Sequence, residues 1–370
     1  MIPVTRPYLP DRRKLGAYLD GIYSRGWLTN NGPLVQLLTE RLEEYLGVRN
    51  LLLVTNGTLA LQIAYHAIGL VTPQASSVRR AVTTPFSFAA TASSLKWEGV
   101  SPHFCDIDAD SWCLDLACLT EIDGRDIHGV VPVHVFGNAC DIEGIQSLAE
   151  RWQAKVVYDG AHAFGVDYQG TSLLQHGDAT TLSLHATKLF HSVEGGAVIF
   201  RDREDLQLAR ELINFGIGPT GELRGLGINA KLSELHAAMA LCVLDDIANI
   251  MESREAIWCH YVLHLDGCVD LQQRHPQASN NYAYFPVAFR DSRSQHACRI
   301  ALEAAGIMPR HYFHPSLDEC GFYGASGEAS RSRSLSSRIL CLPIYPGLSL
   351  TTVERIADVV KCSVTEAVSE

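Results

Sequence analysis

The sequence predicts an α/β fold in which a mostly parallel, mixed sheet is flanked by helices. Short apolar runs of strand length alternate with longer segments whose apolar residues recur at helical spacing. This alternation is typical of parallel sheets in which each strand is followed by a covering helix. The chain has 370 residues, 47% of them hydrophobic, which is ample for a large core and for two domains.

The strands and helices of the first part follow one another in a regular order. A helix over residues 33–46 ends at Gly47 and places five leucines on one face: Leu34, Leu37, Leu38, Leu42 and Leu46. Strands are predicted at 50–54, 80–85, 129–137, 154–159, 181–185 and 195–200. Helices are predicted between them, at 57–69, 88–97 and 141–153.

The pattern of the chain changes after the segment 228–262. Residues 228–262 form one long helical pattern without Pro or Gly, which could bridge to a second unit. Shorter alternating runs follow at 282–289, then helical patterns at 294–306 and 351–364, with an exposed Ser-rich loop expected at 324–338. We therefore predict a large domain over residues 1–245 and a smaller C-terminal α/β domain over 246–370.

Composition excludes several classes of protein. The net charge of −11 argues against a nucleic-acid surface, and no apolar run approaches the roughly 18 residues that span a bilayer. Residues 1–13 have no apolar core of the signal-peptide kind. The eleven cysteines never form a C-x-x-C pair, so a reduced, cytoplasmic protein is expected. The fifteen histidines show no ligand spacing, and no metal site is predicted.

Three polar clusters follow predicted strands. Gly57 and Thr58 open a helix after the strand at 50–54, Asp159 ends the strand at 154–159, and Lys188 lies beyond the strand at 181–185. The carboxyl ends of parallel strands meet in one crevice, where ligands bind. A helix N-terminus suits a phosphate, a carboxylate suits a protonated ring nitrogen, and a partly buried amine can form a Schiff base. Together these requirements match pyridoxal phosphate.

Each residue also has a structural interpretation when it is taken alone. Gly57 can form a tight turn that Thr58 caps, Asp159 can cap the segment that follows it, and Lys188 can be a solvated loop lysine. His162 and His185 can be histidines with satisfied structural hydrogen bonds. The combination at three strand ends favours the cofactor site instead.

Two further residues extend the predicted site. Ser183 lies two residues before His185 on a strand, so both side chains point to the same side, and the Ser183 hydroxyl could bind the phosphate. Phe88 follows the strand at 80–85 and could stack on a planar ring, although a core aromatic is the alternative.

The motifs resemble those of the DegT-like sugar-nucleotide aminotransferases, a family of fold-type I pyridoxal phosphate enzymes. The resemblance covers most of the chain and is carried by an ordered set of segments: "GWLTNNGPLVQLLTERLEEYLGV", "VTNGTLAL", "TTPFSFAATAS", "VVPVHVFGNACDI", "VVYDGAHAFG", "LSLHATKLFHSVEGGAVIF", "GINAKLSELHAAMAL", "NNYAYFPVAF" and "LCLPIY". It implies that Lys188 holds the cofactor, that Asp159 pairs with the ring nitrogen and that His162 touches the ring oxygen. It also implies that Phe88 stacks on the ring and that the phosphate is bound by Gly57, Thr58 and Ser183.

The resemblance further implies a homodimer with shared active sites, because Asn229 matches an asparagine that reaches the neighbouring subunit's phosphate. The family moves an amino group from L-glutamate to a nucleotide-linked keto-sugar. The segment "LHATK…EGG" resembles members that aminate C4, which favours dTDP-4-dehydro-6-deoxyglucose as acceptor. Expected sugar contacts are Trp27, His185, Tyr312 and His314. The alternatives are a 3-keto-sugar aminotransferase, a pyridoxal phosphate-dependent sugar dehydratase and a non-catalytic regulatory protein of the same fold.

Overall fold

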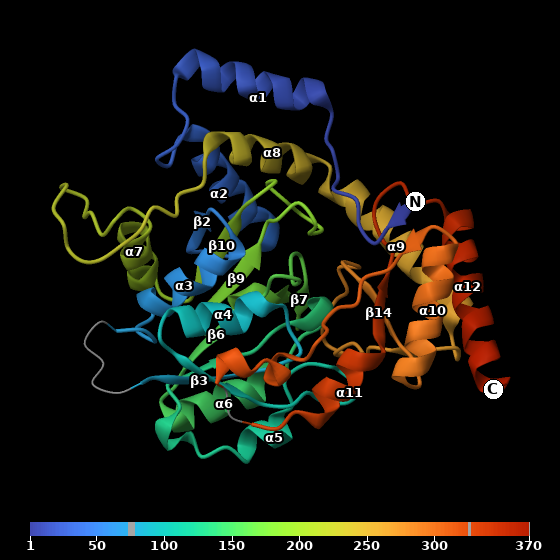
Figure 1. The fold of residues 1–370 in the computed structure, drawn as a ribbon. Coiled ribbons are helices and arrows are strands. Elements are labelled where there is room, and N and C mark those ends of the chain that lie inside the picture. Colours follow the sequence, from blue (N-terminus) through green and yellow to red (C-terminus); the bar gives the residue numbers. More distant parts are fainter. Residues whose placement is uncertain (73–77, 325–326, 370) are drawn as a thin grey trace.

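A seven-stranded sheet forms the centre of the computed structural model, which describes residues 1–72, 78–324 and 327–369 (Figure 1). The strand order is β2-β10-β9-β6-β5-β3-β4. The strands are β2 (Leu51–Val54), β3 (Arg80–Thr83), β4 (Ser101–Phe104), β5 (Gly129–Val131), β6 (Lys155–Asp159), β9 (Ala179–Ser183) and β10 (Gly196–Phe200). Neighbours pair in parallel except β10, which runs antiparallel to β2 and β9. The predicted mixed, mostly parallel sheet is confirmed.

Helices cover both faces of this sheet. Alternate residues of β2 enter opposite cores, since Leu51 and Leu53 belong to one and Leu52 and Val54 to the other. The core of Leu52 is closed by α3 (Gly57–Ala67), α4 (Ala89–Trp97) and α7 (Arg203–Leu212). The core of Leu51 is closed by α2 (Pro33–Leu46), α5 (Leu116–Thr120), α6 (Ile142–Trp152) and α8 (Glu234–Asp245).

The C-terminal part has a core of its own. Helices α9 (Ile247–Leu265), α10 (Ser292–Ala304) and α12 (Leu350–Ser369) pack against an antiparallel sheet of β11 (Asp270–Leu271), β12 (Phe285–Ala288) and β14 (Ile339–Leu342). The first strand, β1 (Ile2–Pro3), pairs with β13 (Ile307–Met308) beside this core. The division into domains at residues 245 and 246 stays a prediction.

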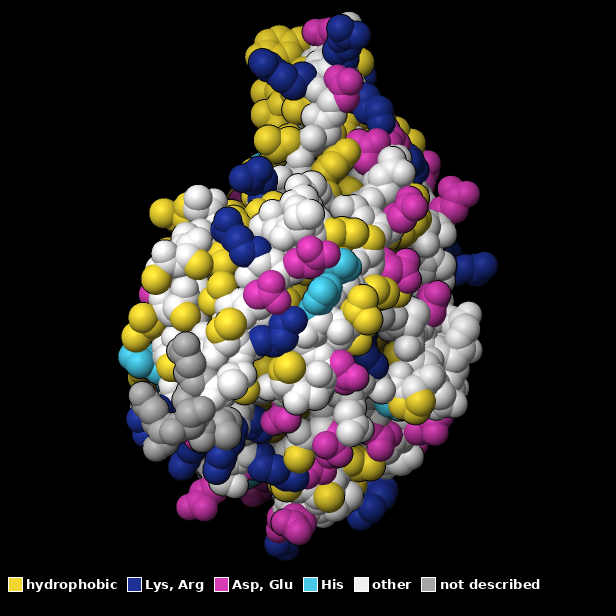
Figure 2. Space-filling model, turned by 90° about the vertical axis from the view of Figure 1, so that its right-hand side faces the viewer, with side chains coloured by type: hydrophobic (Ala, Val, Ile, Leu, Met, Phe, Trp, Pro, Cys, Tyr) yellow, Lys and Arg dark blue, Asp and Glu magenta, His cyan; other side chains and the backbone are white. Residues whose placement is uncertain are grey.

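A short hairpin and the first helix of the chain lie at the surface of the large sheet unit. The hairpin of β7 (Asp167–Tyr168) and β8 (Thr171–Ser172) is a short two-stranded sheet. Helix α1 (Arg12–Arg25) packs on α8 and projects from the body of the molecule (Figures 1 and 2). In the described ranges, no helix is both long and apolar enough to cross a membrane.

Two sequence predictions fail in the second half of the chain. The long helix expected over 228–262 is two helices, α8 and α9, which meet at Asp246. The loop expected over 324–338 contains α11 (Ser330–Arg338), while residues 325–326 lie outside the described ranges. The buried carboxylate of Asp106 accepts hydrogen bonds from the backbone N–H groups of Arg331 (2.9 Å) and Ser332 (2.9 Å). The residue that caps α11 is distant in sequence, so the local Ser-rich segment gives no sign that a helix begins there.

Candidate active site

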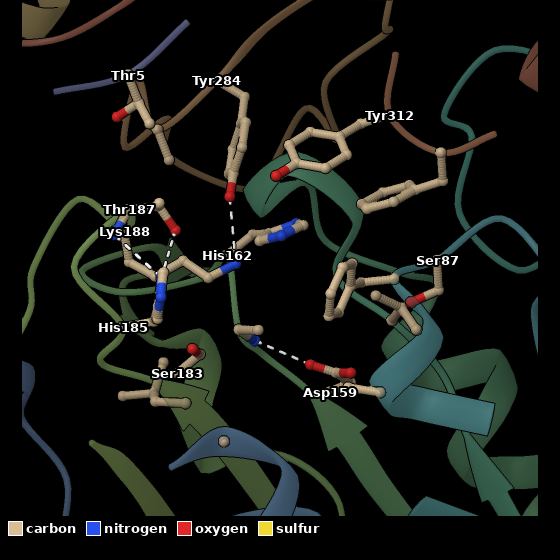
Figure 3. Close-up of a pocket in the computed structure, with 18 of the residues that line it drawn as sticks. Thr5, Ser87, Asp159, His162, Ser183, His185, Thr187, Lys188, Tyr284 and Tyr312 are labelled. Carbon is tan, nitrogen blue, oxygen red and sulfur yellow. Dashed lines mark hydrogen bonds between the residues drawn. The ribbon is translucent and has the colours of Figure 1, made fainter. Parts of the chain in front are cut away.

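A cavity of about 330 Å³ lies where the carboxyl ends of β2, β6 and β9 meet the C-terminal part of the chain. Two walls face each other across it (Figure 3). The strand-end wall consists of Gly57, Thr58, Asp159, His162, Ser183 and Lys188. The C-terminal wall consists of Tyr284, Arg310, Tyr312 and Phe313. Residues far apart in sequence thus share one chamber.

The N-terminus of α3 forms an anion cradle at one end of the strand-end wall. The Asn56 side chain caps the helix by accepting from Leu59 N–H at 2.9 Å. The first N–H groups of a helix have no intrahelical acceptor, so those of Gly57 and Thr58 carry the positive helix end. A Cβ added at Gly57 would lie only 3.0 Å from the Cβ of Ser183, which brings that hydroxyl close to the turn. The arrangement suits a phosphate.

Asp159 is held firmly at the end of β6. Its side chain is buried, and its two oxygens accept from the Thr91 hydroxyl (2.7 Å) and from Ala161 N–H (3.1 Å). Ser87 and Thr91 also share a hydrogen bond of 2.7 Å, which fixes the Thr91 hydroxyl. A carboxylate fixed in this way keeps acceptor capacity for a cationic group in the cavity.

His162 is neutral and its tautomer is fixed. Burial holds the pKa of His162 well below its ordinary value, and the nearby Lys188 lowers it further. Its Nδ1 accepts from Phe136 N–H at 3.1 Å, so the proton of the neutral ring is on Nε2. The ring lies nearly parallel to Phe136 and Phe313, at 4° and 3°. His162 can therefore donate one hydrogen bond into the cavity.

Lys188 presents its amine to the centre of the cavity. Its Nζ donates to the Tyr284 hydroxyl at 3.2 Å (Figure 3). Burial lowers the pKa of Lys188, and Asp159 and Tyr312 oppose that shift. Burial raises the pKa of Tyr284, so its phenol stays protonated and is a neutral partner. A larger neutral fraction makes the Lys188 amine a better nucleophile and base.

Three other predicted residues also line the cavity. Phe88 precedes α4 and is 57% exposed, so it is not a core aromatic. His185 shares a hydrogen bond of 2.7 Å with the Thr187 hydroxyl through Nδ1 and lies 3.6 Å from Glu194 through Nε2. Tyr312 contributes to the C-terminal wall. All three residues line the same cavity as Lys188.

Trp27, Asn229 and His314 do not line the cavity of this chain. The Trp27 indole N–H donates to Thr29 C=O at 2.5 Å, and the side chain is 44% exposed. Asn229 is exposed and its backbone pairs with Asn214. His314 is exposed and stacks on His311 with 4.3 Å between ring centroids. Their predicted roles stay predictions, since each side chain faces outward.

The sequence reasoning missed Tyr284, Arg310 and Thr91. Tyr284 lies inside the segment "NNYAYFPVAF" but has no local signal that separates it from a strand aromatic. Buried Arg254 fixes the preceding backbone by donating to the carbonyls of Tyr282 (3.3 Å) and Ala283 (3.1 Å). Thr91 has the sequence context of an ordinary helix residue, and only the folded structure shows that its hydroxyl contacts Asp159. Long-range contacts alone identify these three.

Comparisons with known proteins agree with this geometry. Residues 11–361 match the model of the DegT/DnrJ/EryC1/StrS aminotransferase family. A dTDP-4-amino-4,6-dideoxy-D-glucose transaminase of Shigella dysenteriae is 34% identical over 97% of this chain and 98% of that protein. The same-named transaminase of Escherichia coli is 33% identical, over 96% of each chain.

A solved structure of DesI in the presence of its TDP-sugar product superposes with a TM-score of 0.91, at 30% identity, and covers 99% of this chain and 93% of that one. The fold-type I architecture that the motifs predicted is confirmed by this likeness. The family match extends over almost the whole chain, and the predicted resemblance is confirmed with it. The chain therefore belongs to the DegT/DnrJ/EryC1/StrS aminotransferase family.

Proposed function

We propose that this aminotransferase uses pyridoxal phosphate to move an amino group from L-glutamate to C4 of dTDP-4-dehydro-6-deoxyglucose. One observation carries the proposal: an anion cradle, a buried carboxylate and a partly buried amine line the same cavity. The names of the two transaminases that match nearly the full chain support the choice of sugar and nucleotide.

The residues present fit the cofactor. The α3 N-terminus with Gly57, Thr58 and Ser183 would bind the phosphate, and glycine is favoured at 57 because a Cβ there would crowd Ser183. The cavity-facing ring of Phe88 would stack on the pyridine ring. When bound, pyridoxal phosphate supplies an electron-withdrawing ring that stabilises negative charge on the substrate carbon.

Asp159 would hold the pyridine nitrogen in its protonated form. Its orientation is set by the Thr91 hydroxyl and Ala161 N–H, so little rearrangement is needed when the ring enters. His162 would donate from Nε2 to the ring oxygen, because its Nδ1 is already engaged by Phe136 N–H. Both contacts are made by groups that the fold orients in advance.

Lys188 would be the covalent attachment point and then the proton carrier. With its pKa lowered by burial, the free amine can take a proton from one carbon and return it to another. Tyr284 keeps the amine near the centre of the cavity through their 3.2 Å hydrogen bond. The hydroxyl of Tyr284 stays protonated throughout, so it orients the amine without competing for the proton.

The sugar nucleotide would bind from the open side of the cavity. Lys188 and Arg310 are the lysine and arginine side chains among the described lining residues, and Arg310 is exposed at the rim. A guanidinium at that point suits a diphosphate. His185 and Tyr312 would contact the sugar.

We also propose a homodimer in which each active site takes residues from both chains. Four apolar side chains are 43–84% exposed on the segment that ends at Asn229: Phe215, Leu223, Leu226 and Ile228. Exposed apolar clusters of this kind mark interaction surfaces. Trp27, Asn229 and His314 would then contact the cofactor or the substrate bound in the active site of the neighbouring subunit.

Two experiments test the proposal. Purified protein should be yellow and should bleach when L-glutamate is added, and a panel of nucleotide keto-sugars with product analysis by NMR should give a 4-amino sugar. A 3-amino product would show that the protein is a 3-keto-sugar aminotransferase. Loss of water without amination would show that it is a sugar dehydratase. A colourless protein that binds no pyridoxal phosphate would refute it.

The shared site is tested by mixing subunits. A Lys188→Ala chain and an Asn229→Ala chain should each be impaired alone, whereas their heterodimer should contain one competent site. No recovery of activity on mixing would count against the contribution of Asn229 across the interface.

A further inference from the structure

The C-terminal unit carries a cluster of metal-ligating side chains that the aminotransferase reaction does not use. His260 and His264 lie one turn apart on α9, and Glu354 lies on α12. One ligand atom from each of the three residues lies within 4.8 Å of the other two. We propose that this His260–His264–Glu354 cluster is a binding site for a divalent transition-metal ion such as Zn²⁺.

The chemistry of the three ligands fits that class of ion. Imidazole nitrogen and carboxylate oxygen are the donors that Zn²⁺ takes at about 2.0–2.2 Å, in sites with four ligands or with three and an open position. Two histidines at i and i+4 face the same side of a helix, as a chelating pair requires. Hard cations such as Mg²⁺ prefer all-oxygen ligands and fit this set poorly.

The two helices hold the cluster in advance of binding. The neighbouring stripe of α9 (Ile257, Tyr261 and Leu265) is buried in the C-terminal core. The matching stripe of α12 (Val353, Ile356 and Ala357) enters the same core. Each ligand sits next to one of these buried stripes, so the spacing between α9 and α12 is set by packing. Little backbone movement is then needed to close the site.

An ordinary ion pair accounts for only part of the cluster. His260 Nε2 lies 3.0 Å from Glu354 Oε1, which is a satisfactory hydrogen bond without any metal. His264 is different. Its ring contacts that of His260, with 4.7 Å between centroids, and within the described part of the chain no hydrogen bond to it is found. A third ligand atom within 4.8 Å of an existing pair, on a ring without a hydrogen bond among the described residues, favours metal binding over a simple pair.

The site is open to solvent on one side. The Glu354 side chain is 46% exposed and that of His260 is 19% exposed, so an ion can enter and keep a water ligand. Figure 2 looks onto the side of the molecule where α12 lies and shows histidine and carboxylate side chains next to one another on that face. Binding would replace the hydrogen bond between His260 and Glu354 by bonds to the ion and would join α12 to α9.

Calorimetric titration of the purified full-length protein with Zn²⁺, after treatment with a chelator, tests the site. We expect saturable binding of one ion per chain. His264→Ala, which leaves the His260–Glu354 pair intact, should weaken binding about tenfold or more, since loss of even an outer-shell partner costs that much. His66→Ala is the matched control, because His66 pairs with Glu98 at 2.7 Å on the large sheet unit.

Cysteine binding has to be separated from binding at this cluster, since exposed Cys259 precedes His260. The spectrum of the Co²⁺-loaded protein should lack thiolate charge-transfer bands, and Cys259→Ser should bind Zn²⁺ like the wild type. No saturable binding, equal affinity in the wild type and His264→Ala, or thiolate bands that disappear in Cys259→Ser would each overturn the proposal. These readouts are independent of transaminase activity, which His264→Ala should leave unchanged.

Discussion

The two walls of the cavity are built in different ways. The strand-end wall takes its functional side chains from the ends of strands, the start of a helix and the loops directly after the strands, where the fold of the large sheet positions them. The C-terminal wall takes Tyr284, Arg310 and Tyr312 from short strands and connections of the other unit. In the proposed function, the first wall would supply groups for covalent chemistry and charge, and the second would orient the amine and bind the substrate. We expect substitutions in the two walls to differ in both size and kind of effect.

Lys188→Ala should have the largest effect. It removes both the nucleophile and the proton carrier, so turnover should fall by at least about 10⁴-fold while the fold is retained. Transamination rates and circular dichroism measure the two quantities. Lys155→Ala is the control, because Lys155 lies at the opposite end of β6 beside Asp178 (3.6 Å) and should leave turnover intact. Near-normal turnover of Lys188→Ala would remove the basis of the proposed mechanism.

Asp159→Asn should come second. Loss of the carboxylate removes a buried charge aimed at the cavity, and we expect kcat/KM to fall about 10²–10³-fold together with weaker cofactor binding. Absorbance titration with pyridoxal phosphate and steady-state kinetics measure both. Asp178→Asn changes another buried carboxylate, which accepts from Val156 N–H at 2.7 Å, and should lower stability without that loss of affinity. Equal cofactor affinity in the two variants would contradict the assignment of Asp159.

Arg310→Gln tests the substrate side of the C-terminal wall. Loss of a charge-assisted hydrogen bond should raise KM for the nucleotide sugar about tenfold and leave kcat and the glutamate half-reaction nearly unchanged. Steady-state kinetics with each substrate separate these quantities. Arg299→Gln removes a surface arginine that pairs with Glu303 (2.8 Å) and is the control. A fall in kcat with an unchanged KM would place Arg310 in the chemistry instead.

Tyr284→Phe should have a smaller effect on the same wall. It removes the 3.2 Å hydrogen bond to Lys188, for which we expect kcat to fall about fivefold. A hydrogen bond to the ammonium form favours that form, so its loss should lower the pKa of the amine further and shift the pH profile of kcat. Tyr261→Phe removes a buried hydroxyl that donates to Pro343 C=O at 3.0 Å, and should leave the profile unmoved. Identical profiles for the wild type and Tyr284→Phe would exclude the positioning role.

The prediction with the smallest expected effect on activity concerns stability beneath the strand-end wall. His134, whose backbone N–H donates to Asp159 C=O at 3.1 Å, has its pKa lowered by burial to about 3. The unfolded chain takes up this proton near pH 6.5 and the folded chain does not, so stability is lost as pH falls from about 6.5 towards 3. The contribution is on the order of 1 kcal/mol per pH unit. Urea unfolding of His134→Gln across this range should show a shallower slope, and an unchanged slope would exclude His134 as the source.

The sequence predicted the strand-end wall well and the C-terminal wall poorly, for a physical reason. Gly57, Asp159 and Lys188 each follow an apolar run, and a parallel sheet brings such positions together. Tyr284 and Arg310 are placed by contacts between units, such as that of Arg254 with the backbone before Tyr284. The same limit hid α11, whose cap lies at Asp106. The spacing of His260 and His264 is visible in the sequence, contrary to the expectation of no ligand spacing, but the Glu354 carboxylate of the proposed cluster comes from another helix.

Local periodicity also misplaced one core residue. Leu37 was assigned to the buried face of α2 but is 37% exposed, while Val35 is buried. The buried positions Leu34, Leu38 and Leu42 recur every four residues, and Val35 falls within the same arc of the helix. Counting every leucine as part of one face therefore made the predicted apolar face of α2 wider than the buried face is.

The Asp106 carboxylate at the far edge of the large sheet has a consequence for exchanging parts between relatives. It anchors the start of α11, and α11 runs without a break into β14, whose Leu342 lines the cavity. Consider a chimaera that takes its C-terminal third from another family member. It would keep the substrate-facing surface in register only if Asp106 were replaced together with the start of α11, so that both came from the same parent.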